Sequence, residues 1–286
     1  MDDELFRRVY RTARELAPRR AKRQQFSDAL IVGLYLWAAI RHKPMSWACR
    51  PAHSPHALAG GPLPSVSTLS RRLRSDPARS LLGRLEARLH ARPHPTRVGC
   101  WILDAKPLPV SPYSKDKQAR RGWAYNGLAR GYKLFALCDL DGRIRAWQVH
   151  AMNRAEPTVA PTLLQALERP GYVLADSVYD SVPLHRAAAQ RGLQMIAPRK
   201  DPTGPIGRRA RHGARLHAID MLETFCNRFG PAMYAQRTRI ERAFARLASS
   251  RVGLDHLPGW VRGLDRVRRW TQAKLILDAA QHGAPN

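Results

Sequence analysis

The sequence is poor in acidic residues. It contains 22 Asp and Glu against 49 Lys and Arg, which leaves a net charge of +27. Such an excess favours a polyanionic partner, because side chains that neutralise phosphates release counterions condensed on a nucleic acid. A basic proteome from a GC-rich genome would also produce this bias toward Arg and Ala. We favour a nucleic-acid partner because +27 is large for 286 residues.

Cysteine and long apolar runs are also scarce. The four cysteines form no Cys-x-x-Cys pair and have no His at metal-ligand spacing, which indicates reduced, mostly buried thiols of a cytosolic protein. The longest apolar run, residues 29–40, is too short to span a bilayer and predicts a buried helix. The N-terminus is amphipathic and of mixed charge, which argues against a signal peptide. We therefore expect a cytoplasmic protein without a membrane segment.

Two regions of different pattern follow one another along the chain. Residues 1–92 have helical patterns, whereas apolar strand-like runs alternate with helical ones after residue 98. ARPHPTR, residues 91–97, is the expected linker. These patterns predict a helical N-terminal region, residues 1–95, followed by an α/β or α+β domain with a mixed sheet, residues 96–286.

Local signals predict where several elements begin or turn. Ser27 or Asp28 is expected to cap the helix over the long apolar run, and Ser65 or Ser67 to cap a short helix. Asp141-Gly142 lies between two alternating runs and predicts a β-hairpin.

Two aspartates follow apolar strand-like runs, and a third carboxylate lies on a predicted helix. Asp104 follows WIL and Asp176 follows YVLA. Adjacent strands of one sheet bring such ends together at the carboxyl edge. Pro107 argues against ordinary strand pairing just after Asp104. Glu241 lies beside an apolar helical stripe that is expected to pack on the sheet. The stripe consists of Ile240, Ala243, Phe244 and Leu247.

Three carboxylates without a soft ligand are the set that hard divalent cations prefer. Two such ions roughly 3.5–4 Å apart activate a water or a 3′-hydroxyl and stabilise the leaving oxygen in attack on a phosphodiester. Each residue also has an ordinary structural interpretation, because a strand-end Asp often caps a helix and a helical Glu beside Arg often forms an i,i+4 pair. Asp180 is the main rival ligand, although its position before Val182-Pro183 suits a helix cap.

Four ordered blocks resemble the bacterial insertion-sequence transposases, which carry an Asp-Asp-Glu (DDE) site on an RNase H-like fold. They are ILDAKPLPV, GYKLFALCDLDGRIRAWQVHAMNRAE, VLADSVYDSVPLHRAAAQRGLQMIAPRK and YAQRTRIERAFARLASSRVGLDHLP, within residues 98–282. In the last block Tyr234, Arg237 and Glu241 have the spacing of the family's Tyr-x2-Arg-x3-Glu-x6-Lys signature. The resemblance implies an α/β fold with an RNase H-like mixed sheet flanked by helices, and a catalytic domain over residues 96–286.

The resemblance also implies the chemistry and its residues. Asp104, Asp176 and Glu241 would hold two Mg²⁺ (or Mn²⁺) ions. The implied or plausible DNA contacts near them are Tyr234, Arg237, Lys106, Lys133 and Arg246, with a solvated surface role as the alternative for the two lysines. The expected protein is a DNA transposase that cleaves element ends and joins the 3′-OH to target DNA. It would act as a homodimer on DNA in the bacterial cytoplasm, associated with the nucleoid.

The N-terminal segment PSVSTLSRRLR resembles the piece that precedes the catalytic domain in these transposases. The residues expected to face phosphates from a recognition helix are Ser67, Thr68, Arg71, Arg72 and Arg74. The alternative is a basic, solvated helix face. Trp123 and Tyr125 are candidates for stacking on an unpaired base, with packing in a strand or turn as the alternative.

Two positions depart from the family pattern. Ala248 stands where the signature has Lys, so Arg246 or Arg251 is expected to take over that phosphate contact. Ser177-Val178 stands where relatives have Lys-Gly. Two alternative functions follow: a metal-dependent nuclease without strand transfer, and a domesticated or decayed transposase that only binds DNA. The intact carboxylates argue against decay, whereas Ala248 argues mildly for it.

Overall fold

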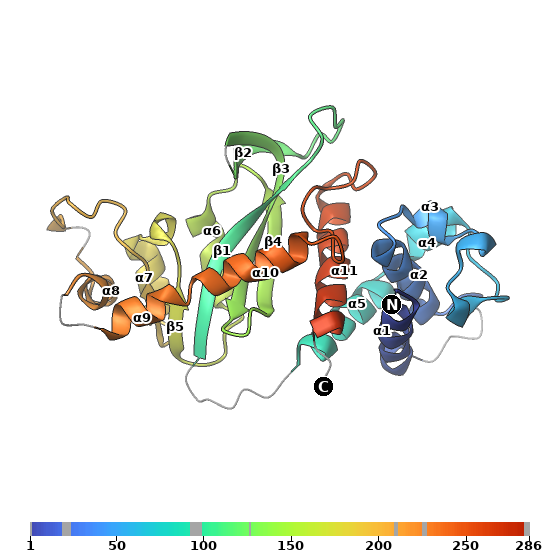
Figure 1. Cartoon of the computed structure of the whole chain (residues 1–286), viewed down its shortest axis with the longest axis horizontal. Helices are drawn as coiled ribbons and strands as arrows, with labels where there is room; N and C mark the ends of the chain where they lie inside the picture. The colour runs from blue at the N-terminus through green and yellow to red at the C-terminus, as the bar shows by residue number, and fades with distance from the viewer. Residues whose placement is uncertain are drawn as a thin grey trace. The chain divides into compact units, whose positions relative to one another are not determined.

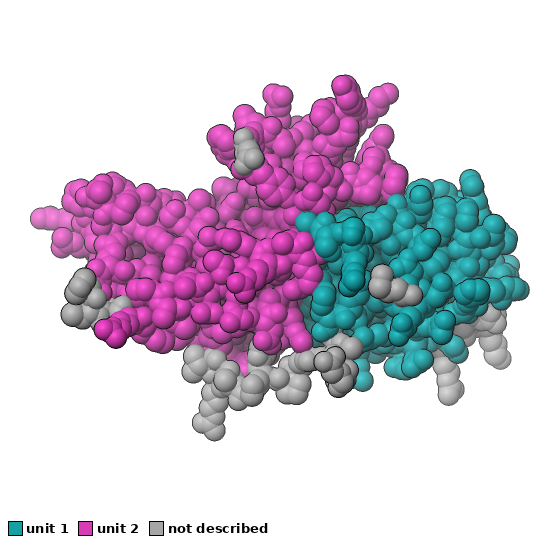
Figure 2. All heavy atoms as spheres, viewed as in Figure 1, with its two compact units in different colours: residues 1–92, 247–254, 265–286 teal, residues 93–246, 255–264 magenta. Residues whose placement is uncertain are grey.

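A computed structural model of the chain describes residues 2–18, 24–91, 99–125, 127–208, 211–224 and 228–282. The chain divides into two compact units (Figure 2). Unit 1 comprises residues 1–92, 247–254 and 265–286, and unit 2 comprises residues 93–246 and 255–264. Nearly all of the expected linker, residues 91–97, lies outside the described residues. The division into a DNA-binding and a catalytic domain at residue 95 stays a prediction.

The described elements of unit 1 are helices, as the sequence predicts. They are α1 (Asp2–Leu16), α2 (Asp28–Ile40), α3 (Met45–Ala48), the 3-10 turns η1 (Pro51–His53) and η2 (His56–Leu58), α4 (Val66–Arg72), α5 (Asp76–His90) and most of α11 (Leu264–His282). Helix α2 is buried along nearly its whole length. Ser27 caps α2 by accepting from the N–H of Leu30, and Ser65 caps α4 by accepting from the N–H of Thr68. None of the described helices is long and apolar enough to cross a bilayer.

A lysine lies in the core of unit 1 without a carboxylate partner among the described residues. Lys274 in α11 is 0% exposed. Its Nζ donates to Ala39 O at 2.6 Å and lies 3.2 Å from His42 Nδ1. The ring of Trp270, 4.7 Å from Nζ, offers a cation–π contact. Burial nevertheless lowers the pKa of Lys274 to about 7.

Replacing Lys274 by Met is expected to stabilise the protein at neutral pH by about 2 kcal/mol. The pKa of Lys274 in the folded state, about 7, lies below its ordinary value of 10.5. Between these two pH values the unfolded state therefore binds more protons than the folded state. Wild-type stability should therefore rise from pH 7 toward pH 10.5 at this site. The carbonyl of Ala39 stays hydrogen-bonded in the variant, because it also accepts from the N–H groups of Arg41 and His42.

Denaturant unfolding at about pH 7 and about pH 9 measures both effects. The Lys274→Met variant should lack the part of the rise that the lysine causes. An equal change with pH in the two proteins would contradict the buried, destabilised ammonium.

Unit 2 contains a mixed sheet with helices on both faces. Its elements are β1 (Gly99–Pro109), β2 (Arg120–Ala124), β3 (Gly127–Asp139), β4 (Ile144–Ala151), α6 (Glu156–Leu164), β5 (Gly171–Leu174), η3 (Ser177–Tyr179), α7 (Val182–Ala189), β6 (Leu193–Ile196), α8 (Gly213–Glu223), α9 (Phe229–Ala235) and most of α10 (Thr238–Ala248). The strand order is β2-β3-β1-β5-β6, and β4 also pairs with β3. β5 and β6 run parallel to β1, whereas β3 is antiparallel to β1, β2 and β4. This architecture, together with the helical N-terminal region, confirms the predicted fold class.

Different helices pack on the two faces of this sheet. Apolar side chains of α6 and α7 pack with Trp101, Leu103 and Val173 in one buried core. Helix α10 crosses the opposite side of the sheet (Figure 1). The predicted apolar stripe of α10 is buried along its whole length. The β3–β4 turn occurs at Asp141-Gly142, as predicted, with Gly142 at a φ of 73°. Glycine adopts this left-handed conformation without a Cβ clash.

Strand β1 continues beyond Asp104, so the prediction that Pro107 prevents pairing is wrong. Pro107 and Pro109 both lie opposite residues of β3 in antiparallel register. The N–H of Val110 donates to β3 at 2.9 Å. Backbone N–H groups of successive residues point to opposite edges of a strand, so the nitrogens of Pro107 and Pro109 point away from β3, to the edge of β1 where β5 lies. On that edge β5 pairs with β1 only as far as Ile102. The missing N–H groups therefore interrupt no ladder.

Candidate active site

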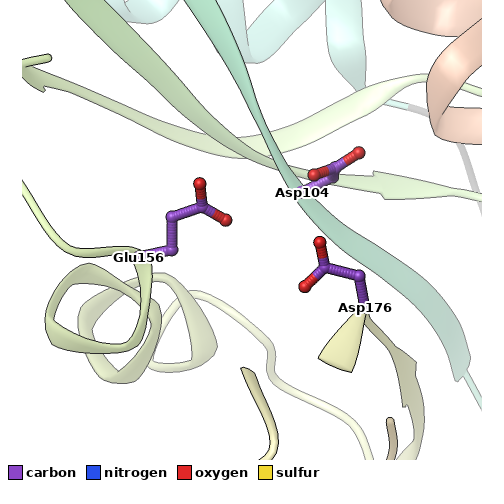
Figure 3. Close-up of side chains that lie close together, drawn as sticks. All are labelled: Asp104, Glu156 and Asp176. Carbon is purple, nitrogen blue, oxygen red and sulfur yellow. The ribbon is translucent and has the colours of Figure 1, made fainter. Parts of the chain in front are cut away.

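Three carboxylates from separate segments gather just beyond the paired part of β1 and β5. Asp104 lies in β1, Asp176 follows β5, and Glu156 begins α6. One oxygen from each lies within 4.8 Å of the others, and Figure 3 shows the three side chains close together. The cluster therefore joins two of the predicted ligands to a carboxylate that the sequence interpretation had not assigned.

The register of the parallel strands explains why the two aspartates meet. Ile102 is opposite Leu174 in the last residue pair between β1 and β5. Asp104 lies two residues after Ile102, and Asp176 lies two residues after Leu174. Alternate residues of neighbouring strands share a face, so both carboxylates leave the sheet on the same side and at the same height.

Burial and mutual repulsion raise the pKa values of both aspartates. Burial raises the pKa of Asp104 to about 7, and the charges of Asp176 and Glu156 add to this increase. The N–H of Ala105, which donates to Asp104 at 2.8 Å, and the guanidinium of Arg237 act in the opposite direction. Burial, followed by the charge of Glu156, also raises the pKa of Asp176. A cation among these groups would remove the repulsion, and hard carboxylate oxygens suit Mg²⁺ or Mn²⁺.

Asp176 is a cap as well as a member of the cluster. Its Oδ1 accepts from the N–H of Val178 at 3.0 Å, at the start of η3. The cap and the cluster therefore do not exclude each other, because the carboxylate has further lone pairs.

The rival ligand Asp180 lies outside the cluster. Arg215 donates to both of its oxygens at 2.6 Å, and His185 Nε2 lies 3.4 Å from Oδ1. Burial alone would raise the pKa of Asp180, but its contacts with His185 and Arg215 hold it well below the usual range. Ser181, rather than Asp180, is the N-cap residue of α7, and no side chain caps that helix. Asp180 is thus the buried partner of Arg215.

Glu241, the third predicted ligand, is separated from the cluster by the guanidinium of Arg237. Arg237 Nη2 donates to Glu241 Oε1 at 2.8 Å, and Nη1 lies 3.9 Å from Asp104 Oδ2. The Glu241 side chain is 53% exposed. Its pairing with Arg237 is the i,i+4 contact weighed as the alternative to a ligand role. Its assignment as a metal ligand stays a prediction.

Lys133 and Tyr234 border the cluster. Lys133 Nζ, in β3, donates to Glu156 Oε1 at 3.0 Å. The pKa of Tyr234, in α9, is raised, chiefly by burial. The charge of Arg237 acts in the opposite direction, and the charge of Asp176 adds to the increase. Both side chains therefore lie near the carboxylates, and their contacts with DNA stay predictions.

Lys106 and Arg246 are already engaged by other groups. Lys106 is 4% exposed and donates to Tyr125 OH at 2.8 Å and to Asp255 Oδ1 at 3.2 Å. A phosphate contact by Lys106 would require this ion pair to open. Arg246 donates to the carbonyl of Gly142 at 2.7 Å and so holds the β3–β4 turn.

The predicted DNA contacts of unit 1 lie on and just after α4. Ser67, Arg71 and Arg74 are exposed, and Thr68 and Arg72 are partly buried. Arg72 donates to Asp28 at 2.5 Å, so it ties α4 to the start of α2. The exposed members are better placed to meet a phosphate backbone than Arg72 is.

Glu156 could have been found only from its position in the topology. An acidic residue in the first turn of a helix is ordinarily explained by the helix dipole, and Glu156 precedes Pro157 in such a turn. The one available signal is that α6 follows the β3–β4 hairpin, whose first strand pairs with β1.

Comparison with known proteins identifies the family of the chain. The sequence profile of a family described as the transposase DDE domain matches residues 99–277, a range that includes Asp104, Glu156, Asp176 and Glu241. No curated protein matches the chain. A cryo-EM structure of the piggyBac transposase synaptic complex with hairpin DNA is similar to it, with a TM-score of 0.47 and 9% identity, over 98% of this chain and 73% of that one. On the strength of the family match over more than half of its length, the chain belongs to the transposase DDE-domain family and is a DNA transposase.

Proposed function

We propose that this transposase cleaves and joins DNA with two divalent metal ions held by Asp104, Asp176 and Glu241, with Glu156 as a further carboxylate of the same set. The observation that carries the proposal is the convergence of Asp104, Asp176 and Glu156 within 4.8 Å. When bound, such ions activate the attacking water or 3′-hydroxyl and stabilise the leaving oxygen. Mg²⁺ or Mn²⁺ fits this all-oxygen donor set.

The surrounding cations bind and orient the phosphodiester. Arg237 now lies between Glu241 and Asp104, and its planar fork can instead donate two hydrogen bonds to a phosphate. Lys133, at the edge of the cluster, adds a second cation for the same phosphate. These contacts favour the increased negative charge of the transition state.

The reaction proceeds in two displacements at phosphorus. In the first, water attacks the phosphodiester at the element end, and the bond to the 3′-oxygen breaks, leaving a 3′-hydroxyl and a 5′-phosphate. In the second, that 3′-hydroxyl attacks a target phosphodiester and releases a new 3′-hydroxyl there. The basic side chains of α4 bind the element end, and a homodimer brings the two ends together.

One assay separates this proposal from its rivals. The protein is incubated with Mg²⁺ or Mn²⁺ and a labelled duplex of the terminal inverted repeat. Cleaved and joined products support the transposase mechanism. Cleavage without joining indicates a nuclease, and retarded bands without cleavage indicate a DNA-binding protein.

Metal affinity is expected to rise with pH up to about 7. The pKa of Asp104 is about 7 in the metal-free protein, and a carboxyl must lose its proton to bind a cation. Each pH unit below this pKa should lower the association constant about tenfold. Calorimetric titration of the wild-type protein with Mn²⁺ at about pH 6 and about pH 8 measures the change. A flat profile for the wild-type protein would contradict the raised pKa.

A further inference from the structure

An exposed ribbon of apolar and basic side chains lies in unit 2, where β2 pairs with residues 127–131 of β3 (Figure 1). Trp123 is 72% exposed, and Leu128, directly opposite it, is 67% exposed. Arg121 precedes Trp123 by two residues, so it lies on the same face, and it is exposed as well. Two large apolar side chains therefore lie side by side on the surface, where a binding partner can cover them.

The opposite face of this ribbon packs against the rest of unit 2. It consists mainly of Gly122, Ala124, Gly127, Ala129 and Gly131. A Cβ atom at Gly122 or Gly131 would overlap the backbone carbonyl of Met152 or Leu108. The small residues thus allow close backbone packing on one side, which turns Trp123 and Leu128 outward on the other.

The ribbon is fixed to the strand that carries Asp104. The hydroxyl of Tyr125 donates to Asp255 Oδ1 at 2.8 Å and accepts from Lys106 Nζ at 2.8 Å. Lys106 follows Asp104 by two residues on the same face of β1. Tyr125 is still 61% exposed. The ring of Tyr125 is therefore held in place beside the strand that carries Asp104, which lowers the entropy cost of binding a partner there.

The charge around the ribbon is positive. Lys115, Lys117, Arg120 and Arg121 are exposed. The two nearby carboxylates are engaged by the protein. Asp116 is 4% exposed and accepts from Tyr132 OH and from the N–H of Gly263, and Asp255 accepts from Tyr125 and Lys106. A second copy of this surface would be repelled by its own charge, whereas a phosphate backbone would be attracted.

We propose that this ribbon binds unpaired nucleotides of the DNA next to the cleaved phosphodiester. Trp123 stacks on a base, and Arg121 pairs with a neighbouring phosphate. Bases inside a duplex are already stacked on both faces, whereas an unpaired base can offer a face to Trp123. The inference rests on the proposed DNA cleavage at Asp104 and adds to it a subsite for single-stranded DNA.

Fluorescence titration without metal tests the ribbon separately from catalysis. The probes are a duplex with a single-stranded extension that contains 2-aminopurine, and the same duplex with blunt ends. Trp123→Ala should weaken binding of the extended duplex about tenfold and leave the blunt duplex unchanged. Trp123→Phe should retain most of the affinity. Phe229→Leu, which removes an exposed ring elsewhere in unit 2, should have no effect.

Two results would overturn the proposal. One is an equal loss, or no loss, for the two probes when Trp123→Ala keeps the wild-type circular dichroism and melting curve. The other is light scattering that shows a wild-type dimer dissociated by Trp123→Ala without selective loss of the extended duplex, because a second copy would then cover the ribbon. Asp104→Asn should bind both probes normally, so a failure of the catalytic proposal leaves this result unaffected.

Discussion

Asp104→Asn and Asp176→Asn should each abolish cleavage of the terminal-repeat duplex, with a loss of at least about three orders of magnitude in rate. Each substitution keeps the size of the side chain and removes a charged oxygen from a cluster whose members lie within 4.8 Å of one another. A loss of that size corresponds to about 4 kcal/mol of transition-state stabilisation, which is within the contribution expected of metal-ion catalysis. Single-turnover cleavage of labelled DNA with saturating Mg²⁺ measures it.

Asp141→Asn is the matched control for these two variants. Asp141 is an exposed aspartate at the β3–β4 turn, so its substitution should leave the cleavage rate near that of the wild type. The two site variants should also melt no lower than the wild-type protein, because both aspartates have raised pKa values and their charges are unfavourable without metal. Cleavage that persists in either folded site variant would show that the carboxylate pair is not the catalytic centre.

Glu241→Gln should abolish cleavage, whereas Glu156→Gln should increase the Mg²⁺ requirement about 10–100-fold and leave detectable cleavage at saturating metal. Glu241 is proposed as a direct ligand once Arg237 turns to the phosphate. Glu156 is already paired with Lys133 at 3.0 Å, so it acts more as a supporting carboxylate, and loss of such a group commonly weakens metal affinity to this extent. Cleavage rates measured across a Mg²⁺ titration separate the two effects.

The same titration can reverse the assignment. If Glu241→Gln cleaved DNA like the wild type while Glu156→Gln was inactive at all Mg²⁺ concentrations, Glu156 would be the third ligand, and the Arg237–Glu241 pair would be an ordinary helical ion pair. Glu223→Gln is a suitable control, because Glu223 also pairs with an arginine, at 2.7 Å, but in α8 and with Arg199. It should not change the Mg²⁺ requirement.

Much of the site could be predicted because its signals are local. Apolar runs that end in Asp104 and Asp176 predict two strands with carboxylates near their ends, and parallel pairing then brings the two groups together. The buried stripe of α10 was likewise predictable from its spacing of apolar residues. The apolar runs and the helical stripe are each visible in a few consecutive residues. The meeting of the two aspartates follows once the two strands are taken to be parallel neighbours.

The rest depends on contacts between distant segments. Pro107 was misinterpreted because the direction of its nitrogen follows from pairing register and from where β5 stops. Glu156 was not assigned because its meaning depends on where α6 begins relative to β1. Strand β2 was not specifically predicted, because the residues of its inward face, Gly122 and Ala124, are small, so its sequence shows no alternation of polar and large apolar side chains. Residues 265–282 join unit 1 through packing that their own pattern does not reveal.

Crystals soaked in Mn²⁺ provide the most direct test of the acidic cluster as a metal site. Anomalous difference density collected at the manganese edge should show a peak in contact with oxygens of Asp104 and Asp176, and the peak should disappear in Asp104→Asn. Absence of any peak at these two aspartates in a wild-type protein that cleaves DNA in the same Mn²⁺ solution would contradict the account.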